Sequence, residues 1–148
     1  MRIIEITGER EKYWDLFLLA DPSKDMVRRY LHQGFLLGAE TQDGRIAGEI
    51  LTVPVGTNEW EIKNLAVSEV FQGKGLGKAL VEAVQYRLPK GTVLLVGTDD
   101  VSGNVGFYES CGFSRFRTEP GFFVKNYPEP LYDHGAQCID MIYLKQIL

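Results

Sequence analysis

Residues 67–80 read Val-Ser-Glu-Val-Phe-Gln-Gly-Lys-Gly-Leu-Gly-Lys-Ala-Leu, with glycines alternating at positions 73, 75 and 77. The glycines separate an expected strand from an expected helix. Because glycine has no Cβ, a ligand can approach the backbone closely there. The first amides of a helix have no intrahelical acceptor, and together with the helix dipole they favour an anion such as a phosphate. With Lys74 and Lys78 beside them, the glycines indicate an anion-binding loop rather than an ordinary turn.

The spacing of this loop fits neither of two familiar phosphate-binding motifs. A Walker-type loop has four residues between its first glycine and its Gly-Lys-Ser/Thr. Here three residues separate Gly73 from Gly77, and Ala79 replaces the hydroxyl that would hold magnesium. In the dinucleotide-binding fingerprint the third glycine would fall on Lys78. A nucleotide-phosphate enzyme is therefore disfavoured.

Length, charge and cysteine usage limit the class of protein. The 148 residues fit one domain, 1–148, with a substantial core. The net charge of −4 argues against nucleic acid and anionic membrane as main partners. Cys111 and Cys138 lie in no metal-ligand spacing, so we expect free thiols and no metal. The sequence shows no signal peptide and no apolar run of membrane-spanning length, so we expect a cytoplasmic protein.

Apolar periodicity and turn residues predict the order of the elements. Strands are expected over 2–6, 35–41, 45–55, 59–67, 92–97, 113–118 and 138–144. Helices are expected over 9–20, 21–33 (with Asp21 as its N-cap), 75–88 and 103–110. Short turns join three strands into an antiparallel meander, and 59–97 forms a right-handed βαβ crossover. We therefore expect an α/β (α+β) fold with a mixed six- to seven-stranded sheet, about four helices and an irregular insert over 119–137.

Two motifs carry a resemblance to a known family. Gln72, Gly75 and Gly77 match the pattern Gln/Arg-x-x-Gly-x-Gly/Ala, and Asn104-x-x-x-Tyr108 precedes Gly112-Phe113. One helix and one strand lie between the motifs. In this arrangement the chain resembles the GNAT superfamily of acetyl-CoA-dependent N-acetyltransferases. The resemblance covers about 59–113 well and the first half in element order only.

The resemblance implies acetyl-CoA as co-substrate and a set of residues that bind it. The pantetheine arm would bond the backbone of Leu65, Ala66 and Val67. The pyrophosphate would lie on the backbone amides of Gln72, Gly73, Lys74, Gly75, Leu76, Gly77 and Lys78. Asn104 and Phe107 match positions that line the cofactor, although Asn104 could instead be a helix cap.

The resemblance also implies direct acetyl transfer to a primary amine in a ternary complex. Tyr108 matches the proposed general acid, which protonates the departing thiolate; the alternative is a core aromatic residue. Glu61 matches the glutamate that acts as base in histone acetyltransferase members. The alternatives for Glu61 are an exposed carboxylate at the end of a strand and a water relay that replaces a fixed base.

The insert is the candidate for acceptor recognition, since loops on a rigid scaffold often carry specificity. Glu129 and Asp133 could attract an ammonium group, and Tyr127 and Tyr132 could add cation–π contacts. The alternative is that these are solvated loop residues. We expect a small amine, such as a polyamine or an aminoglycoside, and a monomer or homodimer. A peptide or protein N-acetyltransferase and a non-catalytic acyl-CoA sensor remain as alternatives.

Overall fold

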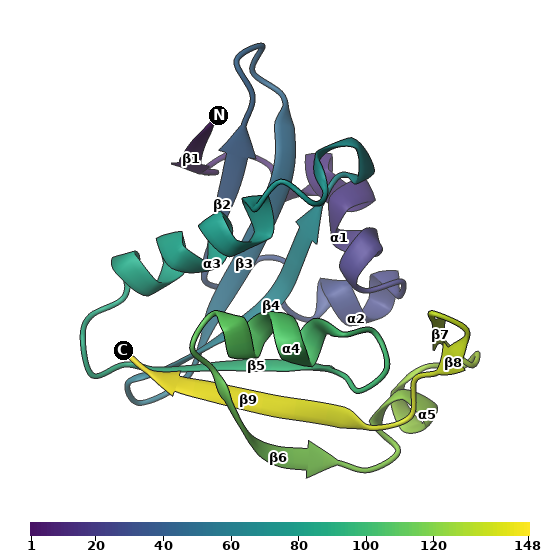
Figure 1. Ribbon diagram of the computed structural model, residues 1–148. Helices are drawn as coiled ribbons and strands as arrows, with labels where there is room; N and C mark the ends of the chain where they lie inside the picture. The colour runs from purple at the N-terminus through teal and green to yellow at the C-terminus, as the bar shows by residue number, and fades with distance from the viewer.

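The computed structural model describes residues 1–148 and contains one seven-stranded mixed sheet (Figure 1). The strand order is β1-β2-β3-β4-β5-β9-β6, and a separate hairpin joins β7 to β8. The strands are β1 (Arg2–Glu5), β2 (Phe35–Glu40), β3 (Ile46–Gly56), β4 (Glu59–Val67), β5 (Val93–Asp99), β6 (Ser114–Glu119), β7 (Tyr132–Asp133), β8 (Ala136–Gln137) and β9 (Met141–Ile147). The predicted mixed sheet, meander and crossover are confirmed.

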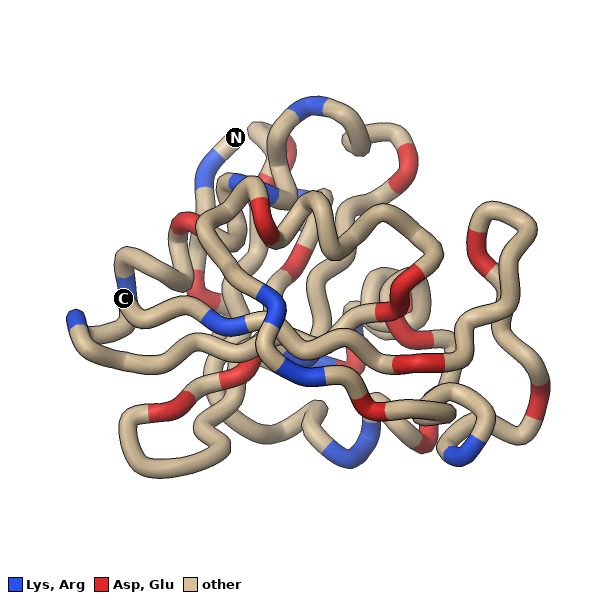
Figure 2. The backbone as a smooth tube through the Cα atoms, turned by 60° about the horizontal axis from the view of Figure 1, so that its bottom comes forward, with Lys and Arg blue, Asp and Glu red and all other residues tan.

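Five α-helices accompany the sheet, one more than expected. They are α1 (Trp14–Ala20), α2 (Lys24–Arg28), α3 (Leu76–Arg87), α4 (Asn104–Ser110) and α5 (Phe122–Asn126). Short 3₁₀ turns precede α1 and α3, at Arg10–Tyr13 and Glu69–Phe71. In Figure 1, α3 and α4 lie in front of the strands. Acidic and basic residues are scattered along the whole backbone (Figure 2).

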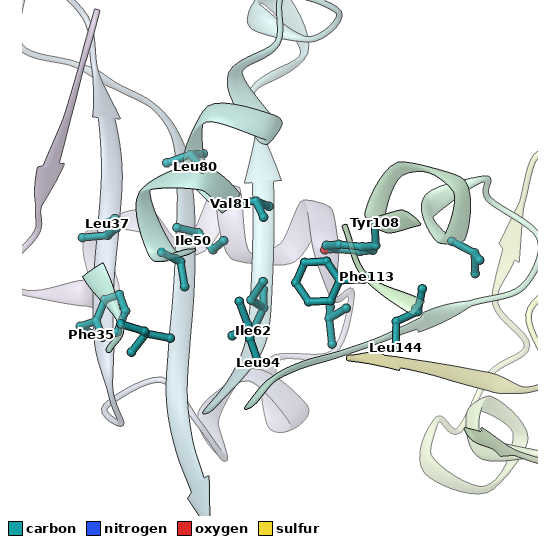
Figure 3. Close-up of a cluster of buried hydrophobic side chains, with 14 of the residues drawn as sticks. Phe35, Leu37, Ile50, Ile62, Leu80, Val81, Leu94, Tyr108, Phe113 and Leu144 are labelled. Atoms are coloured by element: carbon teal, nitrogen blue, oxygen red, sulfur yellow. The ribbon is translucent and has the colours of Figure 1, made fainter. Parts of the chain in front are cut away.

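Apolar side chains form clusters on both faces of the sheet. Leu36 and Leu37, neighbours on β2, belong to different clusters because successive residues of a strand face opposite sides. The larger cluster joins α3 and α4 to the sheet, with Leu80, Val81 and Val105 from the helices (Figure 3). The smaller cluster holds α1 and α2 against the other face. The sheet is therefore covered on both sides, as the apolar strands required.

The first half of the chain corrects two predictions. The helix expected over 21–33 is α2, which ends at Arg28. Its N-cap is Ser23, whose Oγ accepts the Met26 amide at 3.2 Å, and not Asp21. Asp21 accepts hydrogen bonds from the hydroxyls of Tyr30 and Tyr127 instead. The cap of α2 therefore lies two residues later than predicted, and Asp21 makes a tertiary contact through Tyr127.

The C-terminal part differs from the predictions in detail. The final strand is Met141–Ile147 rather than 138–144, and it lies between β5 and β6. The insert is less irregular than expected, since it contains α5 and the β7–β8 hairpin.

The crossover strands β4 and β5 part midway along their length. Their parallel pairing begins at Glu59–Val93 and ends at Ile62–Val96. At that point β4 has a bulge. Ile62 pairs with Thr52 and Asn64 pairs with Leu51, so Lys63 between them has no partner on β3. Beyond it, the edge of β4 that faces β5 has no strand partner. The fold therefore opens a gap at the carboxyl end of β4, where open α/β sheets bind ligands.

Candidate active site

A cavity of about 250 Å³ occupies the gap between β4 and β5, and we call it the first cavity. It is walled by the separated parts of the two strands, by α1 and by α4. Its lining residues include Asn64, Leu65, Ala66, Val67, Gln72, Gly97, Asp99, Asn104, Tyr108 and Asp133. The backbone edge predicted to bind pantetheine, Leu65 to Val67, thus lies on this cavity.

The glycine loop presents a row of unpaired amides at the start of α3. The N–H groups of residues 73–78 donate to no acceptor within the chain. Gly73 and Gly75 have φ values of +76° and +81°, which side chains rarely adopt, and Gly75 is the N-cap of α3. Unpaired amides at a helix N-terminus form a site for an anion.

Gln72 stands outside this row of amides. Its N–H donates to Glu69 O at 3.2 Å. Its side-chain Nε2 donates to Val67 O at 2.8 Å, which ties the loop to the end of β4. Lys74 and Lys78 are exposed on the loop, whereas Leu76 packs toward the core.

The residues predicted on α4 separate into two groups. Asn104 lines the first cavity. It is not the helix cap, because Gly103 holds that position with a φ of +86°. Phe107 is absent from the cavity wall: its ring packs edge-on against Tyr108 and borders Gly77, whose missing Cβ would lie 3.5 Å from the ring. Phe107 therefore fixes the distance between α4 and the loop.

Tyr108 lies on the inner wall of the first cavity. Its ring packs edge-on against Phe107 and Phe113, and its hydroxyl points toward β4 (Figure 3). The hydroxyl makes no hydrogen bond within the chain. Burial raises the pKa of Tyr108, so the phenol keeps its proton at neutral pH. The side chain is both a core aromatic and a protonated donor facing the gap.

A second cavity, of about 400 Å³, lies on the α2 and α5 side of the sheet. Its wall and that of the first cavity share Ile62, Lys63 and Gly97. Glu61 lines the second cavity, and its Oε2 lies 3.2 Å from Lys63 Nζ. The two cavities therefore meet at the point where β4 and β5 part, with Tyr108 on one side and Glu61 on the other.

A chain of hydrogen bonds runs from the insert into the sheet beside both cavities. Tyr127 donates to Asp21 at 2.9 Å, Tyr30 donates to Asp21 at 3.4 Å, and Asn64 Nδ2 donates to the Tyr30 hydroxyl at 2.9 Å. Burial raises the pKa of Asp21 even though hydrogen bonds, the first from Tyr127, act in the other direction. These contacts anchor the insert to the segments on either side of α2 and to β4.

Sequence reasoning missed Glu49, a fully buried carboxyl group on β3. Neither of its oxygens has a hydrogen-bond partner, and burial raises its pKa well above the ordinary value. Glu49 pairs with Ala66 across the ladder, so it lies beside the strand that forms the first cavity. The available signal was that Glu49 is the only charged residue in β3.

The residues predicted to bind the acceptor do not gather at one site. Tyr127 lines the second cavity, whereas Asp133 lines the first, where its carboxylate lies 2.5 Å from His134. Glu129 and Tyr132 are exposed and line neither of these cavities. The end of the molecule formed by the insert carries more acidic than basic residues (Figure 2).

Two further features bear on partners. No three His, Cys, Asp or Glu side chains are grouped closely enough to hold a metal ion. None of the helices has the length and apolar character needed to cross a membrane.

The two cysteines are unpaired. Cys111 and Cys138 are both free thiols, and burial raises the pKa of each.

Known proteins resemble this chain in sequence and fold. A model of the acetyltransferase (GNAT) domain matches residues 32–115. N-acetyltransferase YvbK of Bacillus subtilis (strain 168) is 37% identical over 145 residues, which are 95% of this chain and 93% of YvbK. A GNAT family acetyltransferase from Elizabethkingia anophelis, crystallised with acetyl-CoA bound, has a TM-score of 0.90 and 36% identity over 99% of this chain and 97% of its own. A Bacillus subtilis acetyltransferase in complex with CoA has a TM-score of 0.88 and 34% identity over 99% of this chain and 98% of its own.

The family match spans both motifs on which the resemblance rested, the loop at 72–77 and the segment that starts at Asn104. The two crystal structures extend the likeness over nearly the whole chain. The chain therefore belongs to the GNAT superfamily of acetyltransferases.

Proposed function

We propose that this protein transfers the acetyl group of acetyl-CoA directly to a small primary amine, with the acetyl and pantetheine end of acetyl-CoA in the first cavity and the amine in the second. The observation that carries the proposal is the meeting of the two cavities at Ile62, Lys63 and Gly97. A donor and an acceptor held on opposite sides of one opening can react without an enzyme-bound intermediate.

The donor side uses mostly backbone groups. The free amides of residues 73–78 suit the diphosphate of CoA, and the unpaired edge of β4 suits the amides of the pantetheine arm. Asn104 lies on the same cavity wall. The relatives from E. anophelis and B. subtilis, crystallised with acetyl-CoA and CoA, support this assignment.

The reaction forms one C–N bond and breaks one C–S bond. The amine nitrogen attacks the thioester carbonyl carbon, and the CoA thiolate leaves. Tyr108, which keeps its proton because burial raises its pKa, donates that proton to the thiolate. The attacking ammonium group loses one proton before attack, and the nitrogen loses a second proton, which restores Tyr108, as the amide forms; the net products are an N-acetyl amide, CoA thiol and one released proton.

Glu61 is the candidate base for the ammonium proton. It lines the acceptor side of the opening, and one of its oxygens, Oε1, makes no hydrogen bond within the chain. A water relay is the alternative. If Glu61 is the base, Glu61→Gln lowers kcat by about 100-fold or more while the affinity for acetyl-CoA stays unchanged. A fall of only a fewfold would assign the step to water.

A thiol-release assay with acetyl-CoA and a panel of small primary amines tests the proposal. The expected result is CoA release that depends on the amine, with an equal amount of N-acetyl product seen by mass spectrometry. Calorimetry of acetyl-CoA binding is measured in parallel. Binding without turnover on any amine would support a sensor, and turnover on peptides alone would assign a protein substrate.

A further inference from the structure

The charged side chains of the second cavity are largely paired with one another. Four of its lining residues carry charge: Asp21, Arg29, Glu61 and Lys63. Glu61 and Lys63 form an ion pair at 3.2 Å. Asp21 accepts hydrogen bonds from the Tyr127 and Tyr30 hydroxyls and from the Ser23 amide. The Asp21 carboxylate and one Glu61 oxygen are therefore engaged, which leaves Glu61 Oε1 as the free carboxylate oxygen of this cavity.

Arg29 is the exception. It lies on the turn that follows α2, with an exposed side chain at the wall of the cavity. Its guanidinium group makes no ion pair and no hydrogen bond within the chain, whereas the neighbouring Arg28 pairs with Asp25 at 2.9 Å. A guanidinium group binds a carboxylate through two parallel hydrogen bonds. Arg29 lies near Asp21, but its hydrogen-bond donors are unused, so the guanidinium group can bind an anionic group of the acceptor.

Most of the remaining wall is apolar and includes Met26, Val53, Val55, Phe122, Met141 and the ring of Tyr143, while Gln33 and Asn126 add uncharged polar groups. Glu61 Oε1 can serve one ammonium group, so the further ammonium groups of a polycation would lose hydration without gaining a carboxylate partner, which is unfavourable. A cavity of about 400 Å³ is also near the lower end of the usual range for ligand sites. These properties fit a compact acceptor with an apolar body better than a polyamine or an aminoglycoside.

We infer that the acceptor is an amino acid or a close analogue: a primary amine that carries a carboxylate on an apolar or aromatic frame. The inference rests on the proposed function. The amine faces the opening at Ile62, Lys63 and Gly97, where the thioester carbonyl lies. The carboxylate binds Arg29 at the outer end, and the apolar frame lies on Met26, Phe122 and Met141.

The test compares amino acids with the same amines lacking the carboxylate. Phenylalanine, leucine and methionine are paired with 2-phenylethylamine, 3-methylbutylamine and 3-(methylthio)propylamine, and spermidine and kanamycin are added as polycations. We expect kcat/KM to be about 10-fold or more higher for each amino acid than for its partner, since a hydrogen-bonded ion pair has that effect. We expect the polycations to be the poorest acceptors.

Arg29→Gln assigns the preference to one side chain. It should lower kcat/KM for phenylalanine by about 10- to 100-fold, mainly through KM, and leave 2-phenylethylamine unchanged. Arg28→Gln is the matched control, because Arg28 is the adjacent arginine and does not line the cavity. Arg28→Gln should leave kcat/KM unchanged for both phenylalanine and 2-phenylethylamine.

Three results would overturn the inference: better turnover of the amines that lack a carboxylate, spermidine as the best acceptor, or an equal loss for both substrates in Arg29→Gln. In each of these cases amine acetylation, and so the proposed function, still holds. If acetyl-CoA binds but no amine in the panel is acetylated, the proposed function itself fails.

Discussion

The two cavities that meet between β4 and β5 are built from different parts of the polypeptide. The first cavity depends mainly on backbone groups, the amides of residues 73–78 and the edge of β4, supplied by adjacent elements of one crossover. The second depends on side chains from α2, β3, β4, α5 and β9, which are far apart in the sequence. A site built from backbone amides needs glycines at fixed positions, so it can be recognised as a motif in the sequence. A site built from side chains of distant elements has no such motif.

The largest expected effect concerns Tyr108, on the first cavity beside the opening. Tyr108→Phe removes only the hydroxyl, which makes no hydrogen bond within the chain, so the packing of the ring should survive. We expect kcat to fall by about 100-fold or more, the usual contribution of a general acid. Steady-state kinetics and calorimetry of CoA binding check this, with unchanged CoA affinity expected.

Tyr86→Phe is the matched control, because Tyr86 is 93% exposed on α3 and should leave kcat unaltered. Normal turnover in Tyr108→Phe would remove the acid from the mechanism and leave Tyr108 as a core aromatic residue. The first cavity would then be a binding surface only.

The next effect tests whether the first cavity is truly a backbone site. Gly75→Ala keeps the loop uncharged but places a Cβ at a φ of +81°, which costs about 1–2 kcal/mol. The loop relaxes away from that conformation, so we expect the dissociation constant for CoA to rise by about 10-fold. Calorimetric titration with CoA measures the change.

Two comparisons sharpen that result. Gly8→Ala should have no effect, since Gly8 has an ordinary φ and open space around it. Lys74→Met and Lys78→Met should each weaken CoA binding only about 2- to 3-fold, because exposed charges contribute little. A larger loss in the lysine variants than in Gly75→Ala would mean that side chains, and not amides, hold the diphosphate.

Predictions from the sequence were accurate around the backbone-built first cavity and less accurate around the second cavity, which side chains build. The elements around the loop fall within a few residues of their predicted bounds: α3 is Leu76–Arg87 against 75–88, and α4 is Asn104–Ser110 against 103–110. Local glycines and apolar spacing determine these ends. Asp21 was misassigned because its partner Tyr127 lies 106 residues away. Arg29 and Glu49 were missed because their roles depend on which elements pack together.

Glu49 gives a prediction about stability. Its pKa is raised in the folded protein, so the folded state holds a proton that the unfolded chain releases above about pH 4.3. The free energy of unfolding therefore declines as pH rises above that value, by at most about 1.4 kcal/mol per pH unit from this group, until the folded pKa is passed. Glu49→Gln removes that dependence.

Urea unfolding of parent and Glu49→Gln at pH 5, 6, 7 and 8 measures the effect. We expect the variant to gain stability relative to the parent as pH rises, until the folded pKa of Glu49 is passed. Asp21, whose pKa burial also raises, contributes the same slope to both proteins and cancels in the difference. If the free energy of unfolding changes with pH in the same way in the parent and in Glu49→Gln, Glu49 is already ionised in the folded protein.

A modest effect is expected when the attachment of the insert to the second cavity is weakened. Tyr127→Phe removes the 2.9 Å hydrogen bond to Asp21 and leaves the ring, which stacks on Phe123. A hydrogen bond of this kind contributes about 1 kcal/mol, so we expect KM for the amine to rise about 3- to 5-fold with the CoA affinity unchanged. The insert lines the second cavity with Phe122, Asn126 and Tyr127 and the first only with Asp133, so a change in both the KM for the amine and the CoA affinity would contradict the division between the two cavities. Tyr132→Phe, at an exposed tyrosine that lines neither cavity, should change neither constant.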